Sequence, residues 1–479
     1  MATALPRIEV PLTLGDVARD TGGTLYGAPG LRLRGLGTDT RSLHEGALFV
    51  ALKGDRFDGH DHLAAACAKG AGAVLVRRGT SVPDGVAAVT VDDTLVALGA
   101  IARAHALRTR ANIPVVAISG AVGKTTTKEL TAAALAAAVE GPCHATAGNL
   151  NNLVGAPFTL LALTGEHRAM VVECGSNAPG EIDRIAAMAA PHVALCMNAD
   201  IAHTEGMGSI EAVADEEGSV YRHATRALVG NADEPLARAR MALGDPSLPR
   251  WLFGRAPEAH VRLVAREALG DGRARLRYAL RPMRDDTPAE LTVVTALLGE
   301  AAATNIAAAL CVTASLFDAA ALARAAEAVG KVPPVPGRLV PVPLADGTLV
   351  IDDTYNASPR AVRAALDAAR ELAASRKARL VVALGDMLEL GDHGEREHRR
   401  AGALVAEAGA GALVAVGPLS RFTAEEAARG GVAVSTAADS AEGARALREV
   451  ARSGDVVLVK GSRGMRMERC VAALTEAAK

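Results

Sequence analysis

The sequence predicts an α/β protein of three domains, and three observations support this fold class. The chain has 479 residues, whereas single hydrophobic cores stop growing near roughly 250 residues. Half of the residues are hydrophobic but only 2% are aromatic, a composition that suits helices packed on sheets. Short apolar runs alternate with helical spacing, as in parallel sheets covered by helices. We therefore expect a small N-terminal α/β domain over residues 1–110, a central parallel-sheet domain over 111–333 and a C-terminal doubly wound, Rossmann-like domain over 334–479.

The N-terminal and central domains contain simple local patterns. Residues 64–70 have helical spacing and lead into the apolar run 71–76, which indicates a helix followed by a buried strand. A helix over 94–108 precedes Pro114, after which the central domain begins. The strands expected first in that domain cover residues 115–118, 169–173 and 193–197.

A proline-rich segment separates the C-terminal domain from the rest. Residues 332–337 read Val-Pro-Pro-Val-Pro-Gly, which is stiff enough to be a linker. Beyond it, apolar runs again alternate with helical spacing, as in a second doubly wound sheet. The strands expected here cover residues 349–352, 380–384, 412–416 and 456–460.

Charge and cysteine content exclude several classes of protein. Lys plus Arg (52) nearly cancels Asp plus Glu (54), so we expect no nucleic-acid partner, whose backbone needs a basic excess. Six cysteines are scattered without CxxC pairs or zinc-ligand spacing, which indicates buried thiols in a reducing compartment. We find no apolar run of about 18 residues and no signal peptide. We expect a cytoplasmic protein without a membrane span.

The strongest local signal is a glycine turn between an apolar strand and the start of a helix. Gly120 and Gly123 let backbone N–H groups approach phosphate oxygens, and the helix N-terminus adds partial positive charge. Lys124 can reach the β and γ phosphates, and Thr125 or Thr126 offers a hydroxyl to magnesium. The segment therefore predicts an ATP-binding phosphate loop.

The loop departs from the general G-x-x-x-x-G-K-[ST] pattern, because Ile118 stands where that pattern has its first glycine. A shorter G-x-x-G-K-T-T loop remains. An ordinary helix cap is the alternative for a Gly-Lys-Thr triplet, but its place after a buried strand favours nucleotide binding. This narrows the class to kinases, ATPases and ATP-driven ligases.

Three further segments resemble the Mur ligase family. They read Asp-Thr-Tyr-Asn-Ala-Ser-Pro at 353–359, Gly-Asp-Met-Leu-Glu-Leu-Gly at 385–391 and Val-Lys-Gly-Ser-Arg-Gly-Met-Arg-Met-Glu at 459–468. The third favours the family member that joins D-alanyl-D-alanine to UDP-N-acetylmuramoyl-tripeptide. The alternative is the sibling that adds the third residue, meso-diaminopimelate or lysine, whose Asp-Asn-Pro-Arg and Lys-Gly-His-Glu segments do not occur here.

The resemblance runs nearly end to end and implies a reaction. It implies a UDP-binding N-terminal domain, a central P-loop ATPase domain, ATP and Mg²⁺ as cofactors, and a monomer. The γ-phosphoryl group of ATP would activate the tripeptide carboxylate as an acyl phosphate, which the dipeptide amine attacks, with ADP and phosphate as products. Such chemistry depends on positioning and charge neutralisation rather than on covalent help from the protein. An alternative of another class is a P-loop regulatory or transport ATPase.

In the N-terminal domain, segments 38–42, 48–54 and 58–62 resemble the family's UDP-sugar-binding segment. Read alone, Asp-Gly-His at 58–60 is only a polar turn. The resemblance implies that six residues hold the uridine nucleotide or lie beside it: Thr40, Arg41, Lys53, Asp58, Gly59 and His60.

Several residues of the central domain match the family's metal and substrate positions. Glu173 ends a buried strand, where sheets of this type present catalytic groups, and matches the magnesium ligand. His203 aligns with a histidine beside a second magnesium. A helix cap at Glu173 and a solvated histidine at 203 are the alternatives. Asparagine clusters are commonly turns, but three resemble the family loop that meets the substrate and the phosphates: Asn149, Asn151 and Asn152.

The remaining site residues come from both sides of the proline-rich segment. Asn305 and Arg338 match the family's adenine-side and ribose-phosphate contacts. Three residues would reach the nucleotide from the C-terminal domain: Asp353, Tyr355 and Asn356. Three more follow a C-terminal strand and are expected to hold the dipeptide carboxylate: Lys460, Ser462 and Arg463. Such a divided site implies that the C-terminal domain closes over ATP and excludes water, with a hinge near Pro333.

Glu217 stands where most of the family has a lysine that reacts with carbon dioxide to give a carbamate directed toward magnesium. A carbamylated lysine is chemically a long carboxylate, so the resemblance implies that Glu217 supplies the same charge without bicarbonate. Its reach is shorter by roughly 3–4 Å, and we expect a bridging water. The alternative is that Asp215, Glu216 and Glu217 form a solvated acidic helix face.

Overall fold

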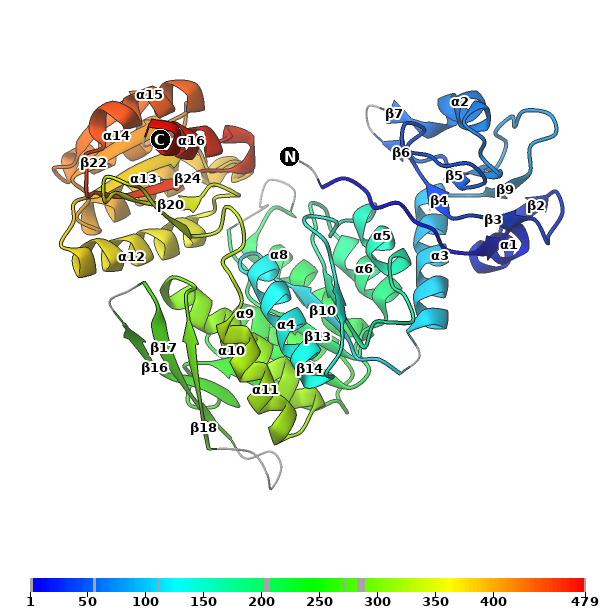
Figure 1. Cartoon of the computed structure of the whole chain (residues 1–479), viewed down its shortest axis with the longest axis horizontal. Helices are drawn as coiled ribbons and strands as arrows, with labels where there is room; N and C mark the ends of the chain where they lie inside the picture. The colour runs from blue at the N-terminus through cyan, green and yellow to red at the C-terminus, as the bar shows by residue number, and fades with distance from the viewer. Residues whose placement is uncertain are drawn as a thin grey trace.

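Three sheets make up most of the protein. The computed structural model describes residues 3–54, 57–110, 112–201, 207–269, 272–281 and 289–477. Within these ranges the three larger sheets take their strands from residues 24–91, 115–295 and 340–460. Figure 1 shows the N-terminal part (blue) and the C-terminal part (yellow to red) at the two upper corners, with the central part (cyan to green) below. The α/β fold class is confirmed, while the exact domain limits stay a prediction.

The N-terminal sheet joins four parallel strands and one antiparallel edge strand among the described residues, in the order β4-β5-β8-β9-β2. The predicted helix and buried strand are confirmed as α2 (Leu63–Ala68) and β8 (Ala73–Arg77). The other elements are β2 (Thr24–Tyr26), β4 (Leu36–Gly37), β5 (Leu48–Val50), β9 (Ala88–Val91), α1 (Leu14–Thr21), and the pairs β1 (Leu12–Thr13) with β3 (Arg32–Leu33) and β6 (Lys53–Gly54) with β7 (Phe57–Asp58).

The central sheet begins as a parallel sheet and ends as an antiparallel one. Its order in the described part of the chain is β11-β12-β10-β13-β14-β15-β16-β17-β18. The three predicted strands are confirmed as β10 (Val115–Ser119), β12 (Ala169–Glu173) and β13 (Val193–Cys196). The others are β11 (Cys143–Ala145), β14 (Ala227–Asn231), β15 (Arg250–Gly254), β16 (Val261–Ala268), β17 (Ala274–Leu280) and β18 (Glu290–Thr295).

The strands β16, β17 and β18 pair antiparallel and form a wing at one edge of the sheet. The expectation of a parallel central sheet was wrong at this edge. Buried side chains alternate with exposed or half-buried ones along β17, because one face of the wing packs and the other meets solvent. A strand of this kind contains no continuous apolar run, which was the signal used to predict strands.

Helices cover both faces of the central sheet. One face carries α3 (Thr94–Thr109), α5 (Gly155–Leu161) and α6 (Glu181–Ala189). The other carries α4 (Lys124–Ala138), α10 (Gly299–Leu316) and α11 (Ala319–Gly330). Two short helices near the sheet's carboxyl edge are α8 (Ile210–Gly218) and α9 (Pro235–Ala239).

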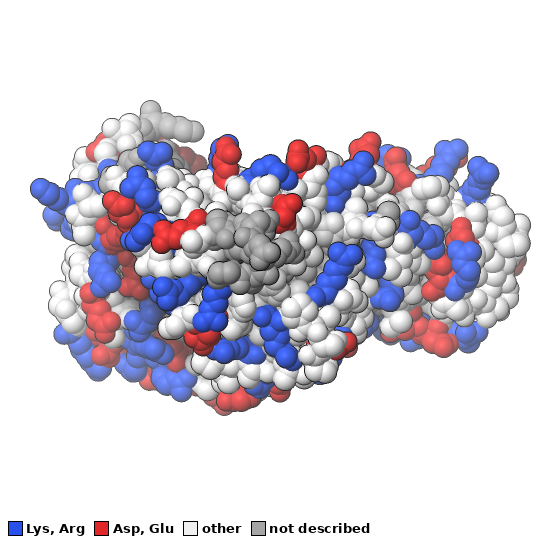
Figure 2. Space-filling view, turned by 90° about the horizontal axis from the view of Figure 1, so that it is seen from below, with Lys and Arg blue, Asp and Glu red and all other residues white. Residues whose placement is uncertain are grey.

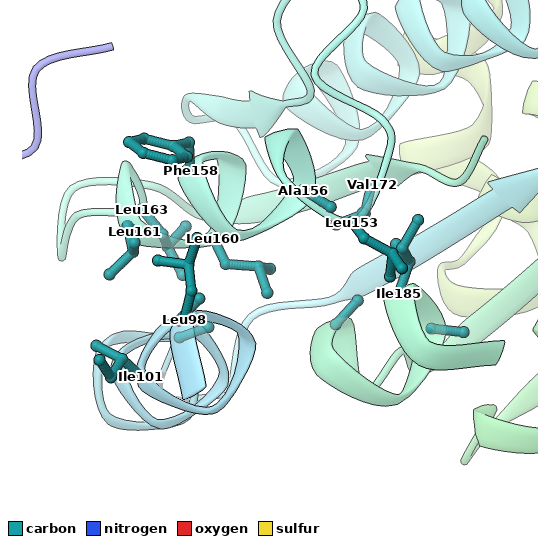
Figure 3. Close-up of a cluster of buried hydrophobic side chains, with 14 of the residues drawn as sticks. Leu98, Ile101, Leu153, Ala156, Phe158, Leu160, Leu161, Leu163, Val172 and Ile185 are labelled. Atoms are coloured by element: carbon teal, nitrogen blue, oxygen red, sulfur yellow. The ribbon is translucent and has the colours of Figure 1, made fainter. Parts of the chain in front are cut away.

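The helix α3 joins the N-terminal sheet to the central one. Figure 3 shows Leu98 of α3 beside Leu160 of α5, both fully buried. The same hydrophobic cluster continues to Leu75 and Val89 in the N-terminal sheet. The two sheets therefore share one core through this helix.

Within the described residues, α10 alone is long and apolar enough to cross a membrane by length and composition, although no such run was noted in the sequence. Of this helix, 72% is buried inside the protein, where it packs on α4, α11 and the sheet. Burial on all sides is the environment of a core helix.

The C-terminal sheet is doubly wound, as predicted. Its order in the described chain is β19-β20-β24-β21-β22-β23, with only β19 antiparallel. One face packs on α12 (Pro359–Arg376), α13 (Gly394–Glu407) and α14 (Ser420–Arg429), and the other on α15 (Ser440–Val450) and α16 (Glu468–Ala477). The predicted strands are confirmed as β20 (Leu349–Asp353), β21 (Leu380–Gly385), β22 (Ala412–Val416) and β24 (Val456–Lys460); β19 (Val340–Pro343) and β23 (Ala433–Ala437) complete the sheet.

The surface carries mixed charge. Figure 2 shows one face of the molecule, on which Lys and Arg (blue) and Asp and Glu (red) occur side by side along its whole length. This mixture agrees with the near balance of 52 basic and 54 acidic residues.

Candidate active site

The predicted phosphate loop connects β10 to α4. Gly123 precedes the helix with φ +92°, and a Cβ there would lie 2.9 Å from Oδ1 of Asn305. Gly120 has φ +134°, and its Cβ would lie 2.7 Å from Cβ of Met197. Both positions require glycine, since side chains rarely adopt such backbone angles and have no room here. The turn brings backbone N–H groups to the N-terminus of a long helix, an arrangement that suits phosphate.

Lys124 and Thr125 begin the helix α4 and reach different partners. The Lys124 ammonium donates to the Gly120 carbonyl and lies 3.7 Å from Oε1 of Glu217. Thr125 Oγ1 donates to Oε1 of Glu173 at 3.2 Å. Thr125, and not Thr126, is therefore the loop threonine that contacts the predicted magnesium ligand.

Glu173 ends β12 and is 2% exposed. Its Oε1 accepts from Asn151 Nδ2 at 2.8 Å as well as from Thr125, whereas Oε2 has no hydrogen-bond partner among the described residues. A buried carboxylate oxygen without a partner is costly, and a bound cation would remove that cost. Carboxylate and hydroxyl oxygens are the ligands that Mg²⁺ prefers, so Glu173 and Thr125 fit this ion. Among the described residues no three His, Cys, Asp or Glu side chains cluster as a metal site, and His203 lies outside those residues.

The three asparagines of the predicted substrate loop differ in their surroundings. Only Asn151 reaches Glu173. Asn149 exchanges two hydrogen bonds with Thr3, at 3.0 and 3.1 Å. Asn152 Oδ1 accepts from Val154 N at 3.2 Å and from Gly155 N at 2.8 Å, so its side chain closes the turn that leads into α5.

Glu217 lies against the phosphate loop. It is 4% exposed; its Oε2 accepts from the Gly120 N–H at 2.5 Å, and its carbonyl accepts from the Ser119 hydroxyl at 2.6 Å. Its neighbour Glu216 is 6% exposed and accepts from two backbone N–H groups at the start of α6. The solvated acidic face was therefore wrong for both glutamates, and only Asp215 is exposed, beside Arg240.

Two residues that were not predicted hold the two loops of the site, Asn198 the phosphate loop and Lys128 the asparagine loop. Asn198, after β13, accepts from Val122 N and donates to Val122 O, both at 2.9 Å. Lys128, one turn beyond Lys124, is 2% exposed and donates to the Thr146 carbonyl at 2.7 Å, at the start of the asparagine loop. Each had a sequence signal: a polar residue directly after a buried strand, and a lysine on the apolar side of a helix.

Arg338 extends from the C-terminal part of the chain to the phosphate loop. Its Nη2 donates to Thr125 Oγ1 at 2.9 Å, and its guanidinium lies 4.2 Å from the ring centroid of Tyr355. The backbone beside it is tightly turned, with φ +70° at Gly337 and +51° at Leu339. The predicted linker before it has neither helix nor strand. The segment that leads into the C-terminal sheet thus meets the phosphate loop of the central sheet at Thr125.

Of the residues expected to hold the dipeptide carboxylate, two are buried and already bonded. Lys460 is 2% exposed and donates to Asp353 Oδ2 at 2.6 Å and to the Asn356 carbonyl at 2.9 Å. The Ser462 hydroxyl accepts from Leu388 N at 2.9 Å. Arg463 is exposed, so it is the one of the three that presents its charge to solvent.

The N-terminal candidates gather at one edge of their sheet. Thr40 and Arg41 follow β4 and Lys53 follows β5, and parallel strands place their carboxyl ends together. His60 joins this edge to β8, because its Nε2 accepts from the Arg77 N–H at 3.0 Å while its Nδ1 bonds Asp58 at 2.6 Å.

Some of these N-terminal side chains are held by charged neighbours, whereas others remain exposed to solvent. The hydrogen bond to His60 is the main cause that lowers the pKa of Asp58, which stays ionised. Lys53 lies 3.7 Å from that carboxylate. Gly59 has no room for a side chain, since a Cβ would lie 2.8 Å from Leu52 N. Arg41 pairs with Asp39 and keeps 88% of its side chain exposed.

Two cysteines beside the phosphate loop remain protonated thiols. Burial is the main cause that raises the pKa of Cys196 to about 12, and burial also raises the pKa of Cys174; the negative charge of Glu217 adds to both shifts. All six cysteines of the chain are described and free. Since only a thiolate is a strong nucleophile, the site is built for positioning charge rather than for covalent catalysis by cysteine.

A phosphate loop on one sheet, touched by an arginine that leads into a second Rossmann-like sheet, is the arrangement of a P-loop α/β protein. Family models match the chain in three stretches: the Mur ligase family catalytic domain at 32–127, the Mur ligase middle domain at 118–313, and the Mur ligase glutamate ligase domain at 337–463. The chain belongs to the Mur ligase family.

Individual relatives cover almost the whole chain. The UDP-N-acetylmuramoyl-tripeptide--D-alanyl-D-alanine ligase of Escherichia coli (strain K12) is 35% identical over 98% of this chain and 99% of its own. The enzyme of that name from Bacillus subtilis (strain 168) is 32% identical over 93% of both chains.

Solved structures agree with these relatives. Crystal structure I of MurF from Acinetobacter baumannii matches with a TM-score of 0.87 and 29% identity, over 98% of this chain and 100% of that one. MurF ligase from Thermotoga maritima in complex with ADP matches with a TM-score of 0.78 and 26% identity, over 92% and 97%.

Proposed function

We propose that this chain joins D-alanyl-D-alanine to UDP-N-acetylmuramoyl-tripeptide at the expense of ATP, with ADP and phosphate as products. The observation that supports this most directly is that Thr125 of the phosphate loop contacts both the Glu173 carboxylate and Arg338. The relatives that match over nearly the whole chain are named for these two substrates. A chain that handles UDP-linked substrates and keeps free cysteines works in the cytoplasm.

In the first step, an oxygen of the tripeptide carboxylate attacks the γ-phosphorus of ATP, and ADP leaves. Lys124, the backbone N–H groups before α4 and Arg338 neutralise the phosphate charge during this transfer. The product is an acyl phosphate, which activates the carbonyl carbon. Asn305, Tyr355 and Asn356 bind the nucleotide around this centre.

Thr125 and Glu173, with His203 as the predicted further ligand, would hold Mg²⁺. The free Oε2 of Glu173 supports this assignment. When bound, the ion supplies positive charge at the phosphate oxygens. Glu217 accepts from the Gly120 N–H and places negative charge 3.7 Å from the Lys124 ammonium, which helps to hold that ammonium in the loop.

In the second step, the amine of D-alanyl-D-alanine attacks the acyl carbon, phosphate leaves, and the amine gives up a proton as the C–N bond forms. Water would hydrolyse the acyl phosphate, so the C-terminal part must close over it. The hinge in this proposal is the segment near Pro333, which leads into the turn at Gly337 and Leu339. Thr40, Arg41, Lys53 and His60 bind the UDP end of the substrate, far from the bond that forms.

Substrate-dependent turnover tests the proposal. Purified protein with ATP and Mg²⁺ should release ADP only when both UDP-N-acetylmuramoyl-tripeptide and D-alanyl-D-alanine are present, with a UDP-muramoyl pentapeptide seen by mass spectrometry. Incorporation of meso-diaminopimelate or lysine into the UDP-muramoyl dipeptide would identify the sibling activity instead. ATP hydrolysis without either substrate would identify a regulatory ATPase.

A further inference from the structure

Leu388 is a large apolar side chain, 41% exposed, in the segment Gly-Asp-Met-Leu-Glu-Leu-Gly at 385–391. A single exposed leucine is ordinary on a protein surface. The position of Leu388 is what makes it of interest, because it follows β21 at the carboxyl edge of the C-terminal sheet. This is the edge at which open parallel sheets bind their ligands.

The loop that carries Leu388 is held rigidly by its neighbours. The Leu388 N–H donates to the Ser462 hydroxyl at 2.9 Å, and Ser462 N donates to the Asp386 carbonyl at 3.1 Å. The Asp386 carboxylate is 1% exposed and accepts from the backbone and the hydroxyl of Ser420, both at 2.7 Å. Since the backbone is fixed on both sides, the exposed leucine is held in one place rather than left on a free loop.

Leu388 lies directly against the segment that carries Arg463. A Cβ at Gly464 would lie 2.9 Å from Cδ1 of Leu388, so a larger residue at 464 would have to displace this leucine side chain. Arg463 precedes that glycine and is exposed, with its guanidinium carbon 5.7 Å from the ring centroid of Tyr355. An apolar side chain and a cation therefore stand side by side at this edge.

The same ring connects this pair to the phosphate loop. Arg338 lies 4.2 Å from the Tyr355 centroid and donates to Thr125 at 2.9 Å. A continuous line of side chains thus leads from the phosphate site, where the acyl phosphate forms, to Arg463 and Leu388. An extended dipeptide spans about 7 Å, and its reactive amine and its carboxylate lie at opposite ends. Such a ligand, with its carboxylate at Arg463, would direct its amine along this line toward the phosphate site.

We infer that Leu388 is a specificity-determining residue for the incoming dipeptide, whose C-terminal methyl group it contacts while Arg463 pairs with the carboxylate. The inference rests on the proposed function and names the part of the site that selects D-alanine as the last residue. A leucine gives a methyl group an apolar neighbour, and the guanidinium provides two parallel donors for a carboxylate. Lys460 and Ser462, which are buried and bonded, are positioning residues for this surface.

The test compares dipeptides that lack one methyl group with variants at residue 388. One methyl group in an apolar pocket is worth about tenfold or somewhat more in kcat/KM. Leu388→Ala should raise KM about tenfold for D-alanyl-D-alanine and for glycyl-D-alanine, but not for D-alanyl-glycine, which lacks the contacted methyl. KM for ATP and for the muramoyl tripeptide should not change. In Leu388→Phe, the larger ring would occupy the space of the dipeptide's C-terminal methyl group. This variant should therefore prefer D-alanyl-glycine, which lacks that methyl group.

Leu107→Ala serves as the matched control, because Leu107 is 43% exposed on α3 and lies outside the C-terminal sheet; its kinetics should equal those of the native chain. An unchanged KM for D-alanyl-D-alanine in Leu388→Ala, or an equal loss with all three dipeptides, overturns the inference. If the native chain ligates no dipeptide at all, the proposed function itself is overturned. Retained thermal melting of each variant shows that the kinetic change does not come from unfolding.

Discussion

Lys124 offers the sharpest test at the scale of single residues. Its side chain is 14% exposed and bonds the Gly120 carbonyl, so its role is local to the phosphate loop. Lys124→Ala should lower kcat by at least tenfold, about 1.4 kcal/mol of transition-state stabilisation, because the charge acts on the transferring phosphoryl group. Circular dichroism should show an intact fold. A kcat within tenfold of the native value would make the loop a structural turn.

Glu217 carries a second prediction at this scale. Its carboxylate is held by the Gly120 N–H and stands 3.7 Å from Lys124, so Glu217→Ala leaves both groups without that partner. Ligation should slow at least tenfold, and more magnesium should be needed for half of the maximal rate. Because the carboxylate of a glutamate, unlike a carbamate, is not formed from carbon dioxide, removal of bicarbonate should not affect the native chain.

Asp215→Ala is the control for Glu217, since Asp215 lies on the same helix but is exposed. It should ligate at the native rate. Native rates in Glu217→Ala, or a strong dependence of the native chain on bicarbonate, would contradict the assigned role.

The sequence singled out Gly123, Lys124 and Glu173 because they lie where a buried strand ends or at the turn that follows it. It could not predict the burial of Glu216 and Glu217. Three successive acidic residues on a helix look solvated unless their hydrogen-bond partners are known. The partner of Glu216 lies at the start of α6 and that of Glu217 in the phosphate loop, 34 and 97 residues away in the chain but adjacent in space. Lys460 shows the same limit, since its ion pair with Asp353 forms only when β20 and β24 become neighbours.

At the scale of elements, continuous apolar runs predicted the buried parallel strands almost to the residue. Leu380–Gly385, for example, is buried along its entire length because helices cover both faces. Continuous apolar runs did not predict the antiparallel wing formed by β16, β17 and β18. Its alternation of buried and exposed side chains follows from a face that meets solvent.

The start of β13 provides a prediction for pH. His192 Nδ1 accepts from the Val115 N–H at 3.1 Å, which requires the unprotonated ring. Burial, with smaller contributions from Arg226 and Arg110, lowers the pKa of His192 to about 4 from its ordinary 6.5. The unfolded chain therefore binds this proton first as pH falls. Its contribution to stability is complete above pH 6.5 and is lost as the pH falls from 6.5 toward 4.

Thermal melting of the native chain and of His192→Asn between pH 7.5 and 4 measures this contribution. The asparagine carbonyl keeps an acceptor for Val115 but does not titrate in this range. The melting temperature of the variant should fall less steeply with acid than that of the native chain. Parallel curves would show that His192 does not couple folding to protonation.

At the scale of the whole molecule, α12 is the element that ties the C-terminal sheet to the central one. Its first turn carries Arg360, which pairs with Glu234 beside α9. Its fourth turn carries Glu371, whose two carboxylate oxygens each lie 2.8 Å from Nη1 of Arg266 in the wing. These partners are separated by more than a hundred residues of sequence, so no local pattern could reveal them. The docking of the two sheets is a property that only the folded chain displays.

The Arg266–Glu371 pair leads to the last prediction, because any movement of the C-terminal part about Gly337 must stretch or break it. The Arg266 side chain is 16% exposed and Glu371 36%, so the pair is only partly screened by solvent. Arg266→Met and Glu371→Gln should each weaken the docked arrangement, raise KM for ATP two- to fivefold, about 0.5–1 kcal/mol, and increase the radius of gyration measured by X-ray scattering without nucleotide. The exchanged double variant Arg266→Glu/Glu371→Arg restores the attraction and should recover most of both losses. Arg370→Gln, which removes an exposed ion pair within α12, is the control and should change neither quantity. Additive losses in the Arg266→Met/Glu371→Gln double variant would mean that the two side chains act separately, and the tie between the sheets would have to be sought elsewhere along α12.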